Sequence, residues 1–111
     1  YQLLVGYQSD ITTVVTVDND ILIAERFNLI PAYPNPFNPS TKISFTIDFP
    51  SEIQLDVYDV NGKLIDTILK GFHQSGLYSI EWNASGLASG MYFVHLVRGG
   101  ERLTQKVMLL K

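Results

Sequence analysis

The two histidines are the side chains of this sequence best suited to acid–base or metal chemistry, and their surroundings argue against both roles. His73 lies between Phe72 and Gln74 in an expected loop, whereas His95 lies within the apolar strand "FVHLV". They are far apart in the chain and lack the close spacing typical of paired metal ligands. We therefore expect His73 in a surface loop and His95 on the more exposed face of a strand.

Other patterns that could support chemistry are better explained as turns. The cluster "DND", Asp18 to Asp20, offers oxygen ligands for Ca²⁺, but the remaining ligands of a calcium loop are missing. The triplet "NAS", Asn83 to Ser85, matches a glycosylation sequon and equally fits a turn. Gly62-Lys63 lacks the upstream glycine of a phosphate-binding loop, and no G-x-S-x-G elbow is present. We therefore predict no enzyme activity, no catalytic residue, no metal site and no cofactor.

Composition limits the class of protein further. The chain has 111 residues, 46% of them hydrophobic, which suits one globular domain with an appendage. It has no cysteine, and its net charge of −3 is spread over interspersed acids and bases, which argues against nucleic acid as a partner. Its apolar runs are far shorter than the roughly 20 residues of a membrane-spanning helix, so no membrane-spanning segment is expected. Because the chain begins with Tyr1 and lacks signal-peptide features, we expect a piece of a longer precursor.

The second half of the chain follows the period-two pattern of half-buried strands. Ile43, Phe45 and Ile47 alternate with polar residues in "TKISFTI", and "EIQLDVYD" and "GLYSIEW" alternate in the same way. "GMYFVHLV" is apolar on both faces, as expected of a central strand. Asn61-Gly62 predicts a hairpin turn, and Gly99-Gly100 predicts another before "RLTQKVMLL". Together these segments predict an all-β fold, an antiparallel sandwich of about seven strands.

A proline-rich stretch, "PAYPNPFNPS", precedes these strands and holds four of the five prolines of the chain. Proline fixes φ, donates no backbone hydrogen bond, and disfavours helix in the residue before it. We therefore predict an extended, unpaired and stiff linker over residues 26–40, with the sandwich itself over residues 41–111.

Residues 1–25 differ in character from the rest of the chain. "ITTVVTV" has high strand propensity, whereas "DILIAERFNLI" is ambiguous between helix and strand. A strand in this β-prone N-terminal extension needs a sheet partner, which could be an edge of the sandwich, a neighbouring domain or another molecule. The segment is therefore predicted to be the tail of a preceding cargo domain, a linker or a donor strand.

Several segments, in this order, resemble the type A C-terminal sorting domain of the type nine (Por) secretion system: "AYPNPFNPSTKISFTI", "LDVYDVNGKLI", "GLYSIEWNASGLASGMYFVHL" and "KVMLLK". The same segments are similar to the Ig-like domain of the flagellar hook-capping protein. The resemblance runs from about Arg26 to Lys111 and implies an Ig-like β-sandwich at the C-terminus of a secreted bacterial protein. It also implies an N-terminal cargo domain, recognition by outer-membrane secretion machinery after passage through the periplasm, and a final location in the medium or at the cell surface.

The resemblance further implies roles for individual residues, in a proline motif, a hairpin turn, a Gly-Tyr strand start and a C-terminal secretion signal. The structural motifs fall on Pro34, Asn35 and Pro36, on Asn61 and Gly62, and on Gly90 and Tyr92. The basic and apolar signal falls on Lys106, Val107, Met108, Leu109, Leu110 and Lys111. Val107 and Leu109 are expected on one face of this strand, with Lys106 and Met108 on the other. A receptor could recognise the strand by adding it to a sheet or by docking against its face.

Residues before Arg26 have no match in the sorting family, and they leave an alternative function open. Leu3 to Val17 could complete the sandwich of a neighbouring subunit in an extracellular filament, with the prolines holding donor and acceptor apart. A carbohydrate-binding module that uses Trp82 or the exposed tyrosines is a third possibility. It would require an aromatic row on one solvent face, whereas the alternation of the strand residues indicates that these rings point inward.

Overall fold

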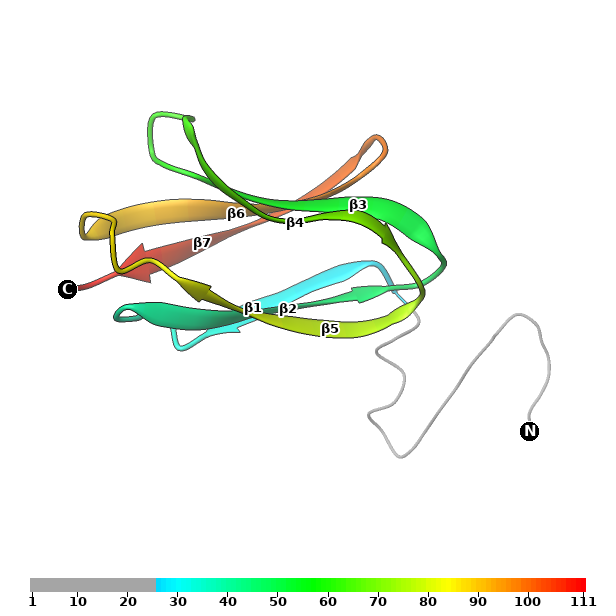
Figure 1. Ribbon diagram of the computed structural model, residues 1–111, viewed down its shortest axis with the longest axis horizontal. Coiled ribbons are helices and arrows are strands. Elements are labelled where there is room, and N and C mark those ends of the chain that lie inside the picture. The colour runs from blue at the N-terminus through cyan, green and yellow to red at the C-terminus, as the bar shows by residue number, and fades with distance from the viewer. Residues whose placement is uncertain (1–25) are drawn as a thin grey trace.

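Residues 26–111, described by the computed structural model, form two packed antiparallel β-sheets (Figure 1). The three-stranded sheet has the order β1 (Asn28–Tyr33), β2 (Ser40–Ile47), β5 (Gly76–Asn83). The four-stranded sheet has the order β4 (Leu64–His73), β3 (Ser51–Tyr58), β6 (Gly90–Arg98), β7 (Glu101–Leu109). The predicted antiparallel sandwich of about seven strands is confirmed, while the donor strand or cargo tail predicted within residues 1–25 lies outside the described residues.

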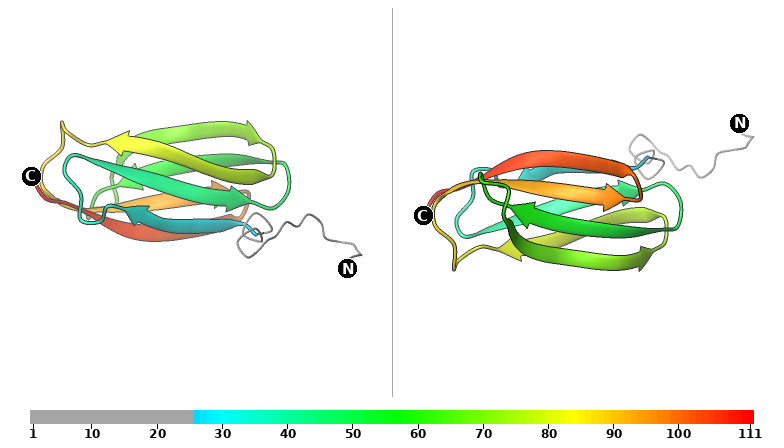
Figure 2. Two further views of the ribbon diagram at one scale, coloured as in Figure 1. Left: turned by 90° about the horizontal axis from the view of Figure 1, so that it is seen from below. Right: turned by 90° about the horizontal axis from the view of Figure 1, so that it is seen from above.

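The connections between strands set which parts of the chain become neighbours. The chain crosses from one sheet to the other after β2, after β4 and after β5. These crossings place β2 beside β5 and β3 beside β6, as the two views of Figure 2 show for the two sheets. Because β6 lies between β3 and β7, the strand expected to be central from its apolar sequence is indeed central.

The alternating apolar residues fill the space between the sheets. Ile43, Phe45 and Ile47 on β2 have no exposed surface, and neither have Val94 and Leu96 on β6. Burying each such side chain contributes about 1.5 to 3 kcal/mol to folding. The period-two pattern of the sequence therefore fixes which face of each strand meets the core.

Both predicted hairpins are present. The turn between β3 and β4 contains Asn61-Gly62, with Gly62 at φ +82°. Asp59 supports this turn, since its Oδ1 accepts hydrogen bonds from the main-chain N–H groups of Asn61 and Lys63. The turn between β6 and β7 consists of Gly99-Gly100, with Gly99 at φ +58°. Glycine adopts these left-handed conformations without steric strain.

The linker predicted over residues 26–40 is corrected by the structure. Asn28–Tyr33 forms β1 and pairs antiparallel with β2, so this part of the stretch belongs to the sandwich. Pro31 is tolerated there because β1 is an edge strand whose register shifts between Ile30 and Tyr33. Phe37, which a linker would expose, is only 2% exposed and packs against Trp82, with ring centroids 5.7 Å apart.

One side chain of the four-stranded sheet differs from the sequence prediction, and another is a buried acid. His73 is the last residue of β4 rather than part of a loop. Asp56 lies on the outward face of β3 but is only 4% exposed. It is covered because Gln54 Nε2 and Thr67 Oγ1 both donate hydrogen bonds to its carboxylate.

Arg98 joins three segments at the end of the sandwich where the described chain begins. Its guanidinium lies between the rings of Phe27 and Phe49, 4.1 and 4.2 Å from their centroids. It also forms ion pairs with Asp48 and Glu101. Burial by itself lowers the pKa of Arg98, but the hydrogen bonds and the charges of these two carboxylates together raise it by more, so the guanidinium stays charged.

Candidate recognition site at the C-terminal strand

The predicted signal, Lys106 to Lys111, comprises the last part of β7 and the two residues that follow it. Val107 and Leu109 have no exposed surface, as expected for side chains that face the core. Met108 is half-buried on the opposite face, and Lys106, Leu110 and Lys111 are exposed. The segment therefore combines two apolar anchors with a set of accessible side chains.

Pairing with β6 fixes this arrangement. The two strands pair residue by residue from Arg98–Glu101 to Gly90–Leu109 without a break in register. A slip by one residue would turn Lys106 into the core and Val107 out to solvent, at a large cost in burial. The two-residue turn and the buried residues of β7 thus determine which side chains of the signal are presented.

The outward face of β7 continues into an apolar and aromatic surface of the four-stranded sheet. Met91 on β6 lies opposite Met108, and Phe93 lies opposite Lys106. Tyr58 on β3 lies opposite Phe93 from the other side. Met91, Phe93 and Tyr58 are all half-buried. Because they occupy neighbouring positions on adjacent strands, they form a contiguous surface beside the signal residues.

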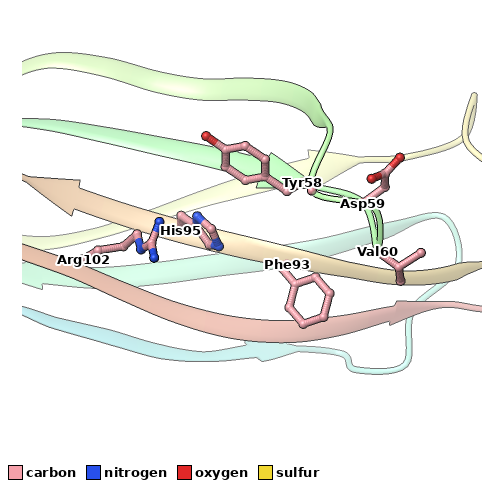
Figure 3. A pocket seen from close by; sticks show the side chains of 7 residues that line it. Tyr58, Asp59, Val60, Phe93, His95 and Arg102 are labelled. Carbon is pink, nitrogen blue, oxygen red and sulfur yellow. The ribbon is translucent and has the colours of Figure 1, made fainter.

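A shallow pocket of about 380 Å³ lies on this same face and is lined by Tyr58, Asp59, Phe93, His95 and Arg102 among others (Figure 3). The rings of Tyr58 and His95 are 4.6 Å apart. Burial, and then the nearby charge of Arg102, lower the pKa of His95, while a neighbouring carboxylate opposes the shift only in part. These effects favour the neutral form of His95.

Among residues 26–111, no three His, Asp or Glu side chains lie close enough together to hold a metal ion. Trp82, the residue considered for carbohydrate binding, is 4% exposed and faces the core. Its indole Nε1 donates a hydrogen bond to Asp66 at 3.2 Å, so its polar atom is also occupied.

The proline motif lies along the outer edge of β7. Asn35 uses its side-chain amide there: Nδ2 donates to Lys106 O at 3.0 Å, and Met108 N donates to Oδ1 at 3.0 Å. Phe37 uses its main chain: its N donates to Met108 O at 2.9 Å, and Leu110 N donates to its O at 3.0 Å. The peptide bonds before Pro34, Pro36 and Pro39 are all cis. The edge of the predicted signal is thus hydrogen-bonded to a segment about 70 residues away in sequence.

Gln105, which the sequence interpretation missed, makes the complementary contact from β7 to β1. Its Nε2 donates to Ile30 O at 2.7 Å, and its Oε1 accepts from Ala32 N at 2.8 Å. One feature of the sequence could have indicated that Gln105 makes such a contact. An amide at an inward-facing position of an alternating strand must find both a donor and an acceptor.

The structure brings most of the family-motif residues close to the signal strand. Gly90 lies opposite Leu109, and Tyr92 lies opposite Val107, with its hydroxyl donating to Ala88 O at 2.7 Å. Asn61 and Gly62 lie in the separate turn between β3 and β4, and Gly62 lines the shallow pocket.

Lys111 is tied to the connection between β5 and β6. Its Nζ donates to Ser85 O at 2.8 Å, and its main-chain N donates to Ser89 Oγ at 2.9 Å. The accessible side chains of the signal without such a tie are therefore Lys106, Met108 and Leu110, within the part of the chain that is described.

Comparison with known proteins identifies the family. A family model described as the secretion system C-terminal sorting domain, of the Por type, matches residues 31–110. No curated protein sequence and no solved structure matches the chain. The part of the chain from residue 26 onward contains no helix long and apolar enough to cross a membrane. The chain therefore belongs to the secretion system C-terminal sorting domains, non-catalytic domains of secreted or cell-surface bacterial proteins that direct secretion through the type nine system.

Proposed function

We propose that the outer-membrane secretion machinery recognises Lys106 to Lys111 through the outward-facing side chains of β7. The observation that carries this proposal is the division of the segment into two sets. Val107 and Leu109 are fully buried and hold the strand in the sandwich, while Lys106 and Leu110 are exposed and Met108 is half-buried. A folded domain can present the second set without losing the first.

The chemistry of this surface indicates what a receptor would offer. Lys106 supplies a positive charge, which a carboxylate on the receptor can pair with. Met108 and its neighbours Met91 and Phe93 supply an adaptable apolar surface, since methionine fits irregular contacts readily. The receptor site is therefore an acidic rim beside an apolar patch.

The position of the signal within the domain also fits a sorting role. The described chain begins at one end of the sandwich, whereas β7 ends at the other (Figure 1). The nine residues of β7 extend about 30 Å. A cargo domain attached before residue 26 would therefore join the sandwich at the end away from the signal, and would not cover it as the protein passes from the periplasm to the cell surface.

Single substitutions test this proposal better than truncation does. Deleting residues 106–111 removes Val107 and Leu109 from the core, so loss of secretion could follow from unfolding alone. Met108→Asp changes only the outward face. Thr104→Asp is the matched control, because Thr104 lies on the same face of β7, four residues before Met108 and outside the predicted signal.

The assay measures secretion of a reporter protein fused before the full chain, in a bacterium with a type nine system. We expect the Met108→Asp fusion to remain in the periplasm and the Thr104→Asp fusion to reach the medium or cell surface. Unfolding curves of both purified variants establish that they are folded. Secretion of the Met108→Asp fusion at the level of the unmodified chain would show that this face is not recognised.

The filament alternative gains no support from the described residues. Its donor segment, Leu3 to Val17, lies outside them. Within residues 26–111 the core is covered by strands of the chain itself, and the edge strand β1 begins at Asn28. The sorting function is therefore the one that the described residues support.

A further inference from the structure

The contacts of the proline motif with β7 reproduce the hydrogen-bonding pattern of a neighbouring parallel strand. Phe37 bonds to the groups on either side of Leu109, namely Met108 O and Leu110 N, which makes a parallel bridge. The side-chain amide of Asn35 bonds to Lys106 O and Met108 N, the groups on either side of Val107. The amide of Asn35 therefore takes the place that a peptide group would occupy one step earlier along the strand.

We propose that Asn35–Phe37 is a built-in cap on the edge of β7, and that without it this edge pairs with the β7 edge of a second copy of the chain. The cap satisfies four outward main-chain groups of the signal strand, at Lys106, Met108 and Leu110. Unpaired groups of this kind on a sheet edge are a template for pairing with another strand.

The prolines explain why the cap does not become a new edge. Pro36 within the cap, and Pro34 and Pro39 beside it, have no N–H group, so this stretch offers few donors to a further strand. The carbonyls of the two flanking prolines are also occupied within the domain. Thr41 Oγ1 donates to Pro34 O at 2.7 Å, and Ala84 N donates to Pro39 O at 2.8 Å. The four-stranded sheet therefore ends at this segment.

Phe37 keeps the cap in position. Its side chain is buried in the core against Trp82, while its main chain bonds to β7 on both sides of Leu109. The polar part of the cap at Asn35 is exposed to solvent. The cap thus has a fixed residue and an accessible one, and the accessible residue can be changed without opening the core.

The uncapped edge of β7 is well suited to pair with itself. Two copies of an edge strand can pair antiparallel about a two-fold axis, each using the same residues. A pairing centred on Val107 uses only Lys106 O and Met108 N, the two groups that the Asn35 side chain covers. It sets Lys106 of one copy opposite Met108 of the second copy, so no two lysines face each other. The regular register of β7 over nine residues adds to this tendency.

If the proposed function holds, the cap also determines how the signal is recognised. With the edge occupied from Lys106 to Leu110, strand addition to a receptor sheet is blocked. The outward face is then the side of the signal strand that remains accessible, and recognition takes place there.

The test uses the full chain with Asn35→Ala, which removes both amide contacts, and with Asn38→Ala as the matched control. Asn38 is also exposed and also precedes a proline, and none of the hydrogen bonds described here involves its side chain. Hydrogen exchange measured by NMR reports on the Met108 amide, which bonds to Asn35, and on the Val107 amide, which points to β6. Light scattering over a concentration series reports the mass in solution.

We expect Asn35→Ala to speed exchange of the Met108 amide about five-fold or more in dilute solution, with little change at Val107. We also expect Asn35→Ala, unlike the control Asn38→Ala, to form dimers as the concentration rises. Asn35→Asp keeps an acceptor for the Met108 amide, so its exchange should stay slow there. Unchanged Met108 exchange in Asn35→Ala, or faster exchange with a mass that stays equal to that of Asn38→Ala, would overturn the proposal. Neither result bears on secretion of the Met108→Asp fusion, so failure of the cap and failure of the recognised face are distinguishable.

Discussion

Replacing Phe37 by alanine distinguishes a proline-rich linker from an integral part of the sandwich. In a linker this ring would be solvated, and its loss would change the free energy of unfolding by about 0.5 kcal/mol or less. In the structure the ring is 2% exposed and packs against Trp82. Truncating a buried phenylalanine costs about 3 to 5 kcal/mol, from lost transfer free energy and from the cavity that remains. We therefore expect Phe37→Ala to be among the most destabilising substitutions outside the regular strands.

Urea denaturation measures this cost directly. With a slope of about 1 to 1.5 kcal/mol/M, a loss of 3 kcal/mol lowers the midpoint by about 2 M or more. The slope itself should stay the same if the native and unfolded states keep their compactness. Phe37→Leu keeps most of the buried volume, and we expect it to cost about 1.5 kcal/mol or less.

Tyr33→Ala is the matched control, because Tyr33 is an aromatic residue just before the same proline motif but is 80% exposed. Its loss should leave the midpoint nearly unchanged. If Phe37→Ala and Tyr33→Ala had the same midpoint as the unmodified chain, the ring of Phe37 would not be part of the core, and the placement of the proline motif described above would be wrong.

Two further predictions concern charged groups. Burial and the charge of Arg102 hold the pKa of His95 below its ordinary value of 6.5, so the unfolded chain binds a proton there more readily than the folded one. Lowering the pH through 6.5 should therefore reduce the free energy of unfolding of the unmodified chain more than that of His95→Gln. Urea denaturation at several pH values measures both free energies. The same dependence on pH for both proteins would contradict this prediction. Arg98→Lys should lower the free energy of unfolding by about 1 to 2 kcal/mol, because lysine cannot stack between two phenylalanine rings and pair with two carboxylates at once. The same change at the exposed Arg102 should be nearly neutral, and equal stability of both variants would count against the role given to Arg98.

The strands and turns were predictable because their signals are local. The alternation of Ile43, Phe45 and Ile47 indicates which face is buried, whatever the rest of the chain does. Asn61-Gly62 indicates a tight turn for an equally local reason, since glycine adopts positive φ without strain. The pairing of the strands into a sandwich follows from burying the faces so defined.

The role of the proline motif was not predictable by the same reasoning. The lack of N–H groups on proline led to the interpretation of an unpaired linker, and that interpretation overlooked the residues between the prolines. Asn35 keeps a side-chain amide and Phe37 keeps its main-chain groups, and both bond to β7 about 70 residues later in the sequence. Gln105 was missed for the same reason, because its partners on β1 lie about as far away. Local patterns can indicate that such a side chain needs a partner, but they do not identify a partner this far away in the sequence.

For the candidate site, the sequence indicated the segment but not the way it is displayed. Alternation predicted that Val107 and Leu109 face the same side, and the structure shows them buried. Whether the edge or the outward face of β7 is accessible depends on the contacts of Asn35 and Phe37 with this strand. Those contacts exist only in the folded domain, so the sequence pattern did not reveal them. The assignment of Lys106 to Lys111 as the signal came from the family resemblance and is a proposal that the secretion assay tests.

The placement of the two ends of the described chain has a mechanical consequence. β1 and β7 run in the same direction and are joined along their sides through Gln105, while the start of β1 and the end of β7 lie at opposite ends of the sandwich (Figure 1). Tension applied between residue 26 and Lys111 would therefore load the hydrogen bonds of both edge strands in shear, all together, rather than opening them one after another as in peeling. Forced unfolding is governed by the height of the unfolding barrier, and loading in shear raises the force needed to cross it. We expect the domain to stay folded while its two ends are drawn apart, as a tether would.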